Sequence, residues 1–184
     1  MIELIIKIVV LVLIILFLVI RNRFTKHYTK FTYKYFGKYI IIGFLMFFYL
    51  GGYFDNFVFN FNLILRILLG AIFLVFGFSL FFWAHYHLNE NWSPIIEKKF
   101  TKSRSLIKTG PYKYIRHPIY TASFIVLIGF FVFTANWMLA GIPLVILGLF
   151  YISKIRREEK ELIRNFGKEY QNYMKHTGGL LPKI

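Results

Sequence analysis

The sequence predicts an all-α integral membrane protein with about five transmembrane helices, the last two forming a helical hairpin, and a cytoplasmic amphipathic C-terminal helix. Three observations support this fold class: an apolar composition, long runs without charge, and basic residues confined to alternate connections. Of the 184 residues, 58% are apolar and 21% aromatic, and the mean hydropathy is +0.58. Soluble proteins have roughly 45–50% apolar residues, so this composition argues against a water-soluble globule.

The apolar segments define the expected spans, because a helix needs roughly 20 residues to cross a bilayer. The first three segments cover residues 2–20, 39–54 and 63–84. A longer stretch, 119–153, contains no charged residue and is interrupted at 134–136 by Thr-Ala-Asn. We therefore expect a tight turn there, joining two short helical arms, 119–133 and 137–153.

The distribution of basic residues predicts the orientation in the membrane. All but two of the 23 Lys and Arg residues lie in three segments, 21–38, 85–118 and 154–184. The other two connections, around residues 55–62 and at the turn 134–136, carry no Lys or Arg. This alternation predicts that the N-terminus lies outside and the C-terminus in the cytoplasm. We interpret the net charge of +15 as a topology signal with attraction to anionic membrane lipids, and we expect no nucleic-acid partner.

Two parts of the chain differ in expected role. Residues 1–84 are expected to form three N-terminal transmembrane helices. Residues 85–184 are expected to form the catalytic region, which comprises a cytoplasmic loop, the helical hairpin and the C-terminal helix. That last helix is predicted over residues 155–173, with Gly167 interrupting its apolar face, and the glycines at 178–179 are expected to end the ordered part.

The sequence excludes cysteine-based sites and gives no indication of a metal site. The chain has no cysteine, which excludes disulfides, thiolate zinc sites and cysteine nucleophiles. His85 and His87 are two residues apart and diverge on a helix, and no histidine and carboxylate cluster has ligand spacing. We therefore expect no metal.

The first candidate constellation precedes the hairpin. Pro118 suits the first turn of a helix because its missing N–H has no intrahelical partner there. A helix beginning at Pro118 would present free backbone donors, and with Arg116 beside them this favours a negatively charged group. His117 and Tyr120 are three residues apart, so both can face one pocket. The competing interpretation is an interfacial belt of Tyr and Arg without function.

The second candidate constellation follows the last span. Glu158 and Glu159 are adjacent carboxylates between basic side chains and a membrane-embedded stretch. Carboxylates accept hydrogen bonds from hydroxyl or amino groups and compensate a cationic ligand. The competing interpretation is a solvated helix in which these residues form exposed ion pairs with Lys and Arg.

A family resemblance appears when these motifs are read in order. Asn91-Trp92-Ser93 and Leu106-Ile107-Lys108-Thr109-Gly110-Pro111-Tyr112 precede Arg116-His117-Pro118-Ile119-Tyr120, and after the hairpin come Arg156-Arg157-Glu158-Glu159 and Phe166-Gly167-Lys168-Glu169-Tyr170. This arrangement over residues 85–184 resembles the isoprenylcysteine carboxyl methyltransferase family, with its phospholipid-methyltransferase relatives. The resemblance implies a membrane enzyme that uses S-adenosylmethionine (SAM) and methylates a lipidic or small apolar acceptor, such as an isoprenylcysteine carboxylate or a phospholipid amine.

The resemblance, together with the chemistry of Arg116 at the start of the helix, assigns residues to the site. Arg116 and Lys154 are the expected catalytic residues, with Lys154 at a position where the family usually has an arginine that faces the acceptor. The expected cofactor-binding residues are Glu97, Arg104, Ser105, Leu106, Ile107, Tyr112, His117, Pro118, Ile119, Tyr120 and Glu158. Asn136 matches a family asparagine, although by spacing alone it is a turn former.

Two other functions stay open at this point. Membrane sterol reductases resemble the family in the C-terminal region, so an NADPH-dependent reductase is one alternative. NADPH requires a basic cluster for its phosphates, whereas the pair Glu158 and Glu159 suits a cationic cofactor. A non-catalytic membrane protein is the other alternative, in which the motif residues should tolerate alanine individually.

Overall fold

The computed structural model describes residues 4, 5, 7–9, 11, 12, 15, 55, 58, 59, 62–88 and 105–183. Most of the predicted first span and all of the predicted second span, 39–54, lie outside the described residues. The described positions between 4 and 15 are helical, and one of them, Lys7, forms an ion pair with Asp55, with 2.7 Å between Nζ and Oδ1.

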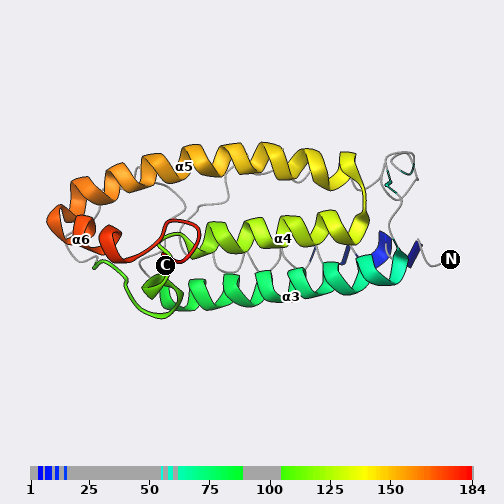
Figure 1. Cartoon of the computed structure of the whole chain (residues 1–184), viewed down its shortest axis with the longest axis horizontal. Helices are drawn as coiled ribbons and strands as arrows, with labels where there is room; N and C mark the ends of the chain where they lie inside the picture. Colours follow the sequence, from blue (N-terminus) through cyan, green and yellow to red (C-terminus); the bar gives the residue numbers. More distant parts are fainter. Residues whose placement is uncertain are drawn as a thin grey trace.

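Three long helices, α3, α4 and α5, run side by side, and the short helix α6 lies at one end of them (Figure 1). The C-terminal end of the described chain returns to the start of α4, although the two are about 60 residues apart in sequence (Figure 1). This return connects the end of the chain to the region where the sequence places its candidate residues.

Helix α3, Leu63–Leu88, begins where predicted but continues four residues beyond the predicted end at residue 84. Asn62 caps its start, because its side-chain Oδ1 accepts a hydrogen bond from the Leu65 N–H at 3.0 Å. His85 and His87, predicted to lie in a loop, belong to the last turn instead, where each ring contacts the carbonyl oxygen four residues earlier at 3.0 Å. Among the described residues, α3 is the one helix long and apolar enough to cross a membrane.

Helix α4, Pro118–Thr134, begins at the predicted proline and ends at the predicted turn. Ala135 has a left-handed conformation with φ of 50° and donates its N–H to the Phe131 carbonyl, which ends the helix. The side chain of Asn136 is fully buried and accepts a hydrogen bond from the Met138 N–H at 3.0 Å. In the structure Asn136 is therefore a turn former, followed by the π-helical turn η5, Trp137–Gly141.

Glycines allow α3 and α4 to approach closely. A Cβ built at Gly70 would lie 2.7 Å from the Cβ of Phe133, and one at Gly77 would lie 2.7 Å from Cγ2 of Val126. Small residues at such contacts let helix backbones pack tightly in apolar surroundings. The pair α3–α4 is therefore a firmly packed unit on which the site is built.

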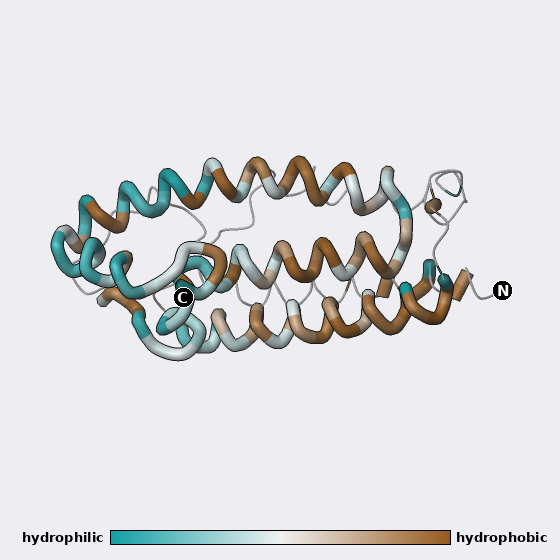
Figure 2. The backbone as a smooth tube through the Cα atoms, in the orientation of Figure 1, coloured by the Kyte–Doolittle hydropathy of each residue, from teal (hydrophilic) through white to brown (hydrophobic). Residues whose placement is uncertain are grey.

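Helix α5, Ile142–Phe166, corrects the prediction for the C-terminal half. The predicted arm ending at 153 and the predicted amphipathic helix starting at 155 are one continuous helix. Its first half is apolar and its second half polar (Figure 2), and nothing in the helical backbone requires a break where hydropathy changes. The break comes at Gly167, with φ of +51°, and the shorter helix α6, Lys168–His176, follows.

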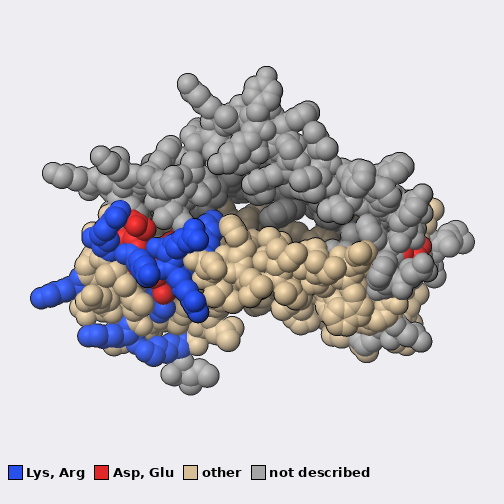
Figure 3. Space-filling model, turned by 90° about the horizontal axis from the view of Figure 1, so that it is seen from above, with Lys and Arg blue, Asp and Glu red and all other residues tan. Residues whose placement is uncertain are grey.

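Lys and Arg side chains gather at the end of the molecule that carries α6 and the second half of α5 (Figure 3). Exposed members of this group are Arg156, Arg157, Lys160, Arg164, Lys168 and Lys175. Charged and apolar surfaces are thus separated along the long axis.

Candidate functional site

The site begins with the turn η4, Gly110–Lys113, which leads the chain from α3 to α4. Gly110 has φ of +57°, and a Cβ there would lie 2.4 Å from the His87 ring, so a side chain fits neither the conformation nor the space. Tyr112 is buried behind this turn, and its carbonyl accepts a hydrogen bond from the Tyr173 hydroxyl of α6. The turn and α6 are thereby fixed to each other.

An ion pair joins the segment before α4 to the second half of α5. Arg116 donates from Nε and Nη2 to Oε1 of Glu159, at 2.9 and 2.7 Å. The two side chains are 12% and 21% exposed, so the pair is largely withdrawn from water. Such a partly buried, doubly hydrogen-bonded pair is stronger than an exposed one. The interpretation of Glu159 as part of a solvated ion-pair helix is therefore wrong.

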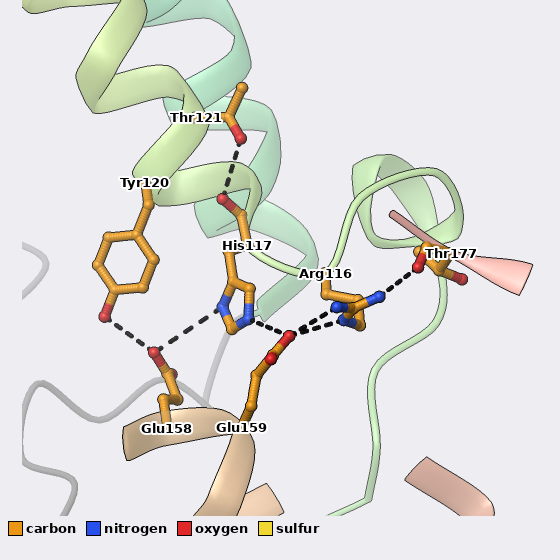
Figure 4. A network of polar contacts seen from close by, with 7 residues as sticks. All are labelled: Arg116, His117, Tyr120, Thr121, Glu158, Glu159 and Thr177. Carbon is orange, nitrogen blue, oxygen red and sulfur yellow. Dashed lines mark hydrogen bonds and ion pairs between the residues drawn. The ribbon is translucent and has the colours of Figure 1, made fainter. Parts of the chain in front are cut away.

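The imidazole of His117 lies between the two adjacent carboxylates (Figure 4). Its Nε2 is 3.3 Å from Oε1 of Glu159, and its Nδ1 is 3.9 Å from Oε2 of Glu158. The ring is only 3% exposed. His117, before the proline, and the acidic doublet thus form one cluster, although His117 and Glu159 are 42 residues apart in sequence.

The electrostatics of the cluster act most strongly on Glu159. Its hydrogen bond to His117, together with Arg116, lowers the pKa of this carboxyl to about 2, against the opposing effect of burial. Glu159 therefore stays ionised throughout the physiological range and compensates the guanidinium beside it.

A second group of contacts surrounds Tyr120 on α4. Its hydroxyl donates to Oε2 of Glu158 at 2.9 Å, and its ring lies 5.1 Å from the ring of Tyr151, centroid to centroid. The Nζ of Lys154 lies 5.3 Å from the centre of the Tyr120 ring, within the range of a cation–π contact. Aromatic faces, a carboxylate and an ammonium group therefore meet at this point.

The C-terminal segment folds back onto the residues that precede α4. The N–H groups of Arg116 and His117 donate to the carbonyls of Gly178 and Gly179 at 2.8 and 3.1 Å. The prediction that the glycines at 178–179 end the ordered part is wrong, because the described chain continues to residue 183. Local patterns cannot show that a tail folds back onto a distant helix, which is why the sequence missed this contact.

Among the residues assigned by resemblance, the structure brings Arg116, His117, Tyr120, Lys154 and Glu158 together. Two others are buried, Tyr112 in the turn η4 and Pro118 at the first position of α4.

Four of the remaining assignments are described, and none of their side chains forms a hydrogen bond with the side chains of the cluster. Ile119 lies in the first turn of α4. Ser105, Leu106 and Ile107 lie on the extended segment before η4, and no hydrogen bond between described residues links them to the cluster. Glu97 and Arg104 lie outside the described residues.

Several contributing residues were not predicted as site residues. The sequence predicted Glu158 as a site residue and did not predict Glu159, although Glu159 binds Arg116 and His117. The hydroxyl of Tyr170 is buried and has no hydrogen-bond partner among the described residues, and burial, with Glu159 nearby, raises its pKa. The others are Thr121, Tyr151 and Thr177. The spacing of Thr121, four residues after His117 and so on the same helix face, is the one available signal for it.

The described part of the chain contains no group of three or more His, Cys, Asp or Glu side chains that could hold a metal ion. The described cluster itself consists of carboxylates, aromatic rings, an imidazole and two cations.

Comparison with known proteins gives a consistent result. The model of the isoprenylcysteine carboxyl methyltransferase family matches residues 68–164. Protein-S-isoprenylcysteine O-methyltransferase of Saccharomyces cerevisiae is 30% identical over 129 residues, which are 69% of this chain and 54% of that protein. The nickel-cobalt-cadmium resistance protein NccN of Alcaligenes xylosoxydans xylosoxydans is 36% identical over 83 residues, 45% of this chain and 38% of that protein. These relatives are therefore matched over about two fifths to half of their length.

A solved structure shares the fold. The eukaryotic intramembrane Ras methyltransferase, an isoprenylcysteine carboxyl methyltransferase, superimposes with a TM-score of 0.57 at 24% identity. The superposition covers 62% of this chain and 41% of that protein.

Proposed function

Because this chain belongs to the isoprenylcysteine carboxyl methyltransferase family, we propose that it is a membrane methyltransferase that uses SAM to methylate the carboxylate of a prenylated cysteine or a similar lipidic acid. The observation that carries the proposal is the meeting of Glu158, His117, Tyr120 and Lys154 at one end of the helical hairpin. These residues come from two helices and combine the groups that a cationic, amino-acid-bearing donor requires.

The residues present fit such a donor chemically. The ring of Tyr120 already holds one cation, the Lys154 ammonium, over its face, so the surroundings suit positive charge. Glu158 is 35% exposed, and its Oε1 makes no hydrogen bond to any described residue. That oxygen is available to accept from a ribose hydroxyl or an amino group.

Each residue then has a proposed role. Glu158 binds and orients polar groups of the donor, and Tyr120 holds Glu158 through its hydroxyl while its ring faces positive charge. His117 fixes the relative position of the two carboxylates. SAM supplies a methyl group on a positively charged sulfur, which makes that methyl electrophilic.

Lys154 supports an anionic acceptor. It follows the apolar first half of α5 in the sequence and precedes the polar second half, so its ammonium can pair with a carboxylate whose hydrocarbon part stays in the lipid. An ionised carboxylate is already nucleophilic and requires no general base. Alignment of the reacting groups and exclusion of water are then the main tasks of the protein.

The ion pair between Arg116 and Glu159 has a different proposed role. Its guanidinium is already compensated by a carboxylate and by the carbonyl of Thr177. We therefore propose that Arg116 holds the segment before α4 in position, in place of the predicted contact with a negatively charged group of the ligand.

The proposal is tested with the purified chain in detergent micelles. Calorimetric titration with SAM, S-adenosylhomocysteine and NADPH in parallel should show binding of the first two only. His117→Ala and Glu158→Gln should each lower the affinity for SAM about tenfold or more, as expected for the loss of a buried positioning group or a charged hydrogen bond. Glu161→Gln, on the same helix but paired with the exposed Arg164, is the matched control and should bind as the parent chain does.

The acceptor is tested by methyl transfer from labelled SAM. A farnesylated N-acetylcysteine should become labelled, whereas its carboxamide, which lacks the carboxylate, should not. Labelling of phosphatidylethanolamine instead would reassign the acceptor to an amine. Binding of NADPH without SAM would reject the proposed function.

A further inference from the structure

Residues 177–183, here called the C-terminal strap, leave α6 and run back across the start of α4 (Figure 1). Two hydrogen bonds hold the strap beside the segment before α4. The Gly178 N–H donates to the Tyr114 carbonyl at 3.3 Å, and the Arg116 N–H donates to the Gly178 carbonyl at 2.8 Å. The strap thus contacts the backbone of the site directly.

The same strap contacts both cluster residues that precede the proline. The His117 N–H donates to the Gly179 carbonyl at 3.1 Å, and Nη1 of Arg116 donates to the Thr177 carbonyl (Figure 4). The strap therefore binds Arg116 both at its backbone N–H and at one nitrogen of its guanidinium. Glu159 binds the other side of the guanidinium.

A third attachment lies one turn into α4. Thr121 donates from its hydroxyl to the Leu180 carbonyl at 2.7 Å. The same hydroxyl oxygen lies 3.3 Å from the His117 carbonyl, so this attachment is next to the backbone of His117 (Figure 4).

Glycine at position 178 is required for this path. A Cβ built there would lie 1.7 Å from the carbonyl oxygen of Leu181 and 2.9 Å from its carbonyl carbon, both of which are backbone atoms. At Gly179 the nearest atom to a Cβ would be Nη2 of Arg116 at 3.6 Å, an ordinary contact. Alanine therefore fits at 179 and displaces the strap at 178.

We propose that the C-terminal strap positions Arg116 and His117 for binding of the methyl donor, and that Gly178 is the positioning residue that makes this possible. The inference rests on the proposed function. Four carbonyl oxygens of the strap, those of residues 177–180, fix the two backbone N–H groups, the guanidinium and the Thr121 hydroxyl. Without these attachments the imidazole is no longer fixed between Glu158 and Glu159, and the donor has to order the site when it binds.

The test compares Gly178→Ala with Gly179→Ala in the full chain in detergent. Gly178→Ala should raise the Kd for SAM about tenfold at a temperature where circular dichroism shows the same helix content as in the parent chain. Gly179→Ala keeps all four carbonyls, and its Kd should stay well below that of Gly178→Ala. Amide hydrogen exchange of Arg116 and His117, measured without ligand, should accelerate in Gly178→Ala only.

Thr121→Val and Thr121→Ser supply a second pair in case Gly178→Ala does not fold. Thr121→Val removes the hydroxyl at nearly constant volume and should weaken SAM binding about three- to tenfold, as for one lost hydrogen bond. Thr121→Ser restores the hydroxyl and should restore the affinity.

The outcomes separate the two proposals. Failure of the parent chain to bind SAM rejects the proposed function. Binding by the parent with equal affinity in Gly178→Ala, or in Thr121→Val where Gly178→Ala does not fold, rejects the role of the strap, as does unchanged exchange of the two amides.

Discussion

At the scale of single residues, Glu159 organises the site because one of its oxygens accepts hydrogen bonds from both Arg116 and His117. Its charge balances a guanidinium that is mostly removed from water. A carboxylate in this position contributes to stability as well as to geometry, since removing it would leave the arginine buried and unpaired.

The lowered pKa of Glu159 predicts how stability depends on pH. In the unfolded chain the carboxyl has its ordinary pKa of 4.5, whereas in the folded chain the pKa is about 2. Its contribution is therefore complete above pH 4.5 and is lost as the pH falls through this range toward 2. The difference in thermal midpoint between the parent chain and Glu159→Gln should be constant near neutral pH and shrink below pH 4.5, as followed by circular dichroism in detergent.

Glu161→Gln serves as the control for this measurement. Glu161 lies on the same helix and pairs with the exposed Arg164, so its contribution to stability is small. A difference between Glu159→Gln and the parent that does not change between pH 7 and pH 3 would contradict the assigned electrostatic role.

At the scale of elements, the contact between α3 and α4 is the rigid support of the site, and it depends on glycine. Gly70→Ala would place a Cβ 2.8 Å from the Cα and 2.9 Å from the backbone nitrogen of Phe133. Because backbone atoms cannot rotate away, the helices must separate, and we expect a loss of about 1–3 kcal/mol in stability. Thermal unfolding in detergent measures this loss.

Gly148→Ala on α5 is the matched variant. Its new Cβ would meet only the outer edge of the Phe124 ring, at 3.2 Å, and that ring can shift. Alanine also has the higher helix propensity, so the variant should be near neutral or slightly stabilising. Equal destabilisation by Gly70→Ala and Gly148→Ala would show that the α3–α4 contact has no special role.

Helix α5 shows why elements were only partly predictable. The apolar arm and the amphipathic segment differ in hydropathy, which led to two predicted helices, but both favour a helical backbone. Helix α5 therefore ends at Gly167, where the backbone leaves the helical conformation with φ of +51°. It does not end where the sequence changes from apolar to polar.

At the scale of the whole molecule, the described connections lie at two opposite ends of the helices. The uncharged hairpin turn and the connection around residues 58–59 lie together, since the Phe59 N–H donates to the Ala135 carbonyl at 2.9 Å. Apart from Lys7 and Arg66, the described basic residues lie toward the opposite end, around α6 and the second half of α5 (Figure 3). This separation is what a chain that crosses a bilayer between these two ends requires.

Orientation can be tested cleanly because the chain contains no cysteine. Trp137→Cys at the hairpin turn and Lys168→Cys on α6 place single thiols at exposed positions. In intact cells a membrane-impermeant maleimide should label Trp137→Cys directly and Lys168→Cys only after permeabilisation. The opposite pattern would reverse the predicted topology, with the C-terminus outside.

The sequence by itself determined the helical class, the start of α4 at Pro118, the turn at 134–136, and the candidate residues His117, Tyr120 and Glu158. These features follow from local signals: hydropathy over about 20 residues, the geometry of proline, and short motifs. Only the tertiary structure decided that Glu159 binds Arg116 and His117, that α5 is continuous, and that the C-terminal strap occupies the backbone donors ahead of α4. Such pairings join residues some 40 to 60 positions apart, and they depend on how helices are rotated against each other, which no local pattern encodes.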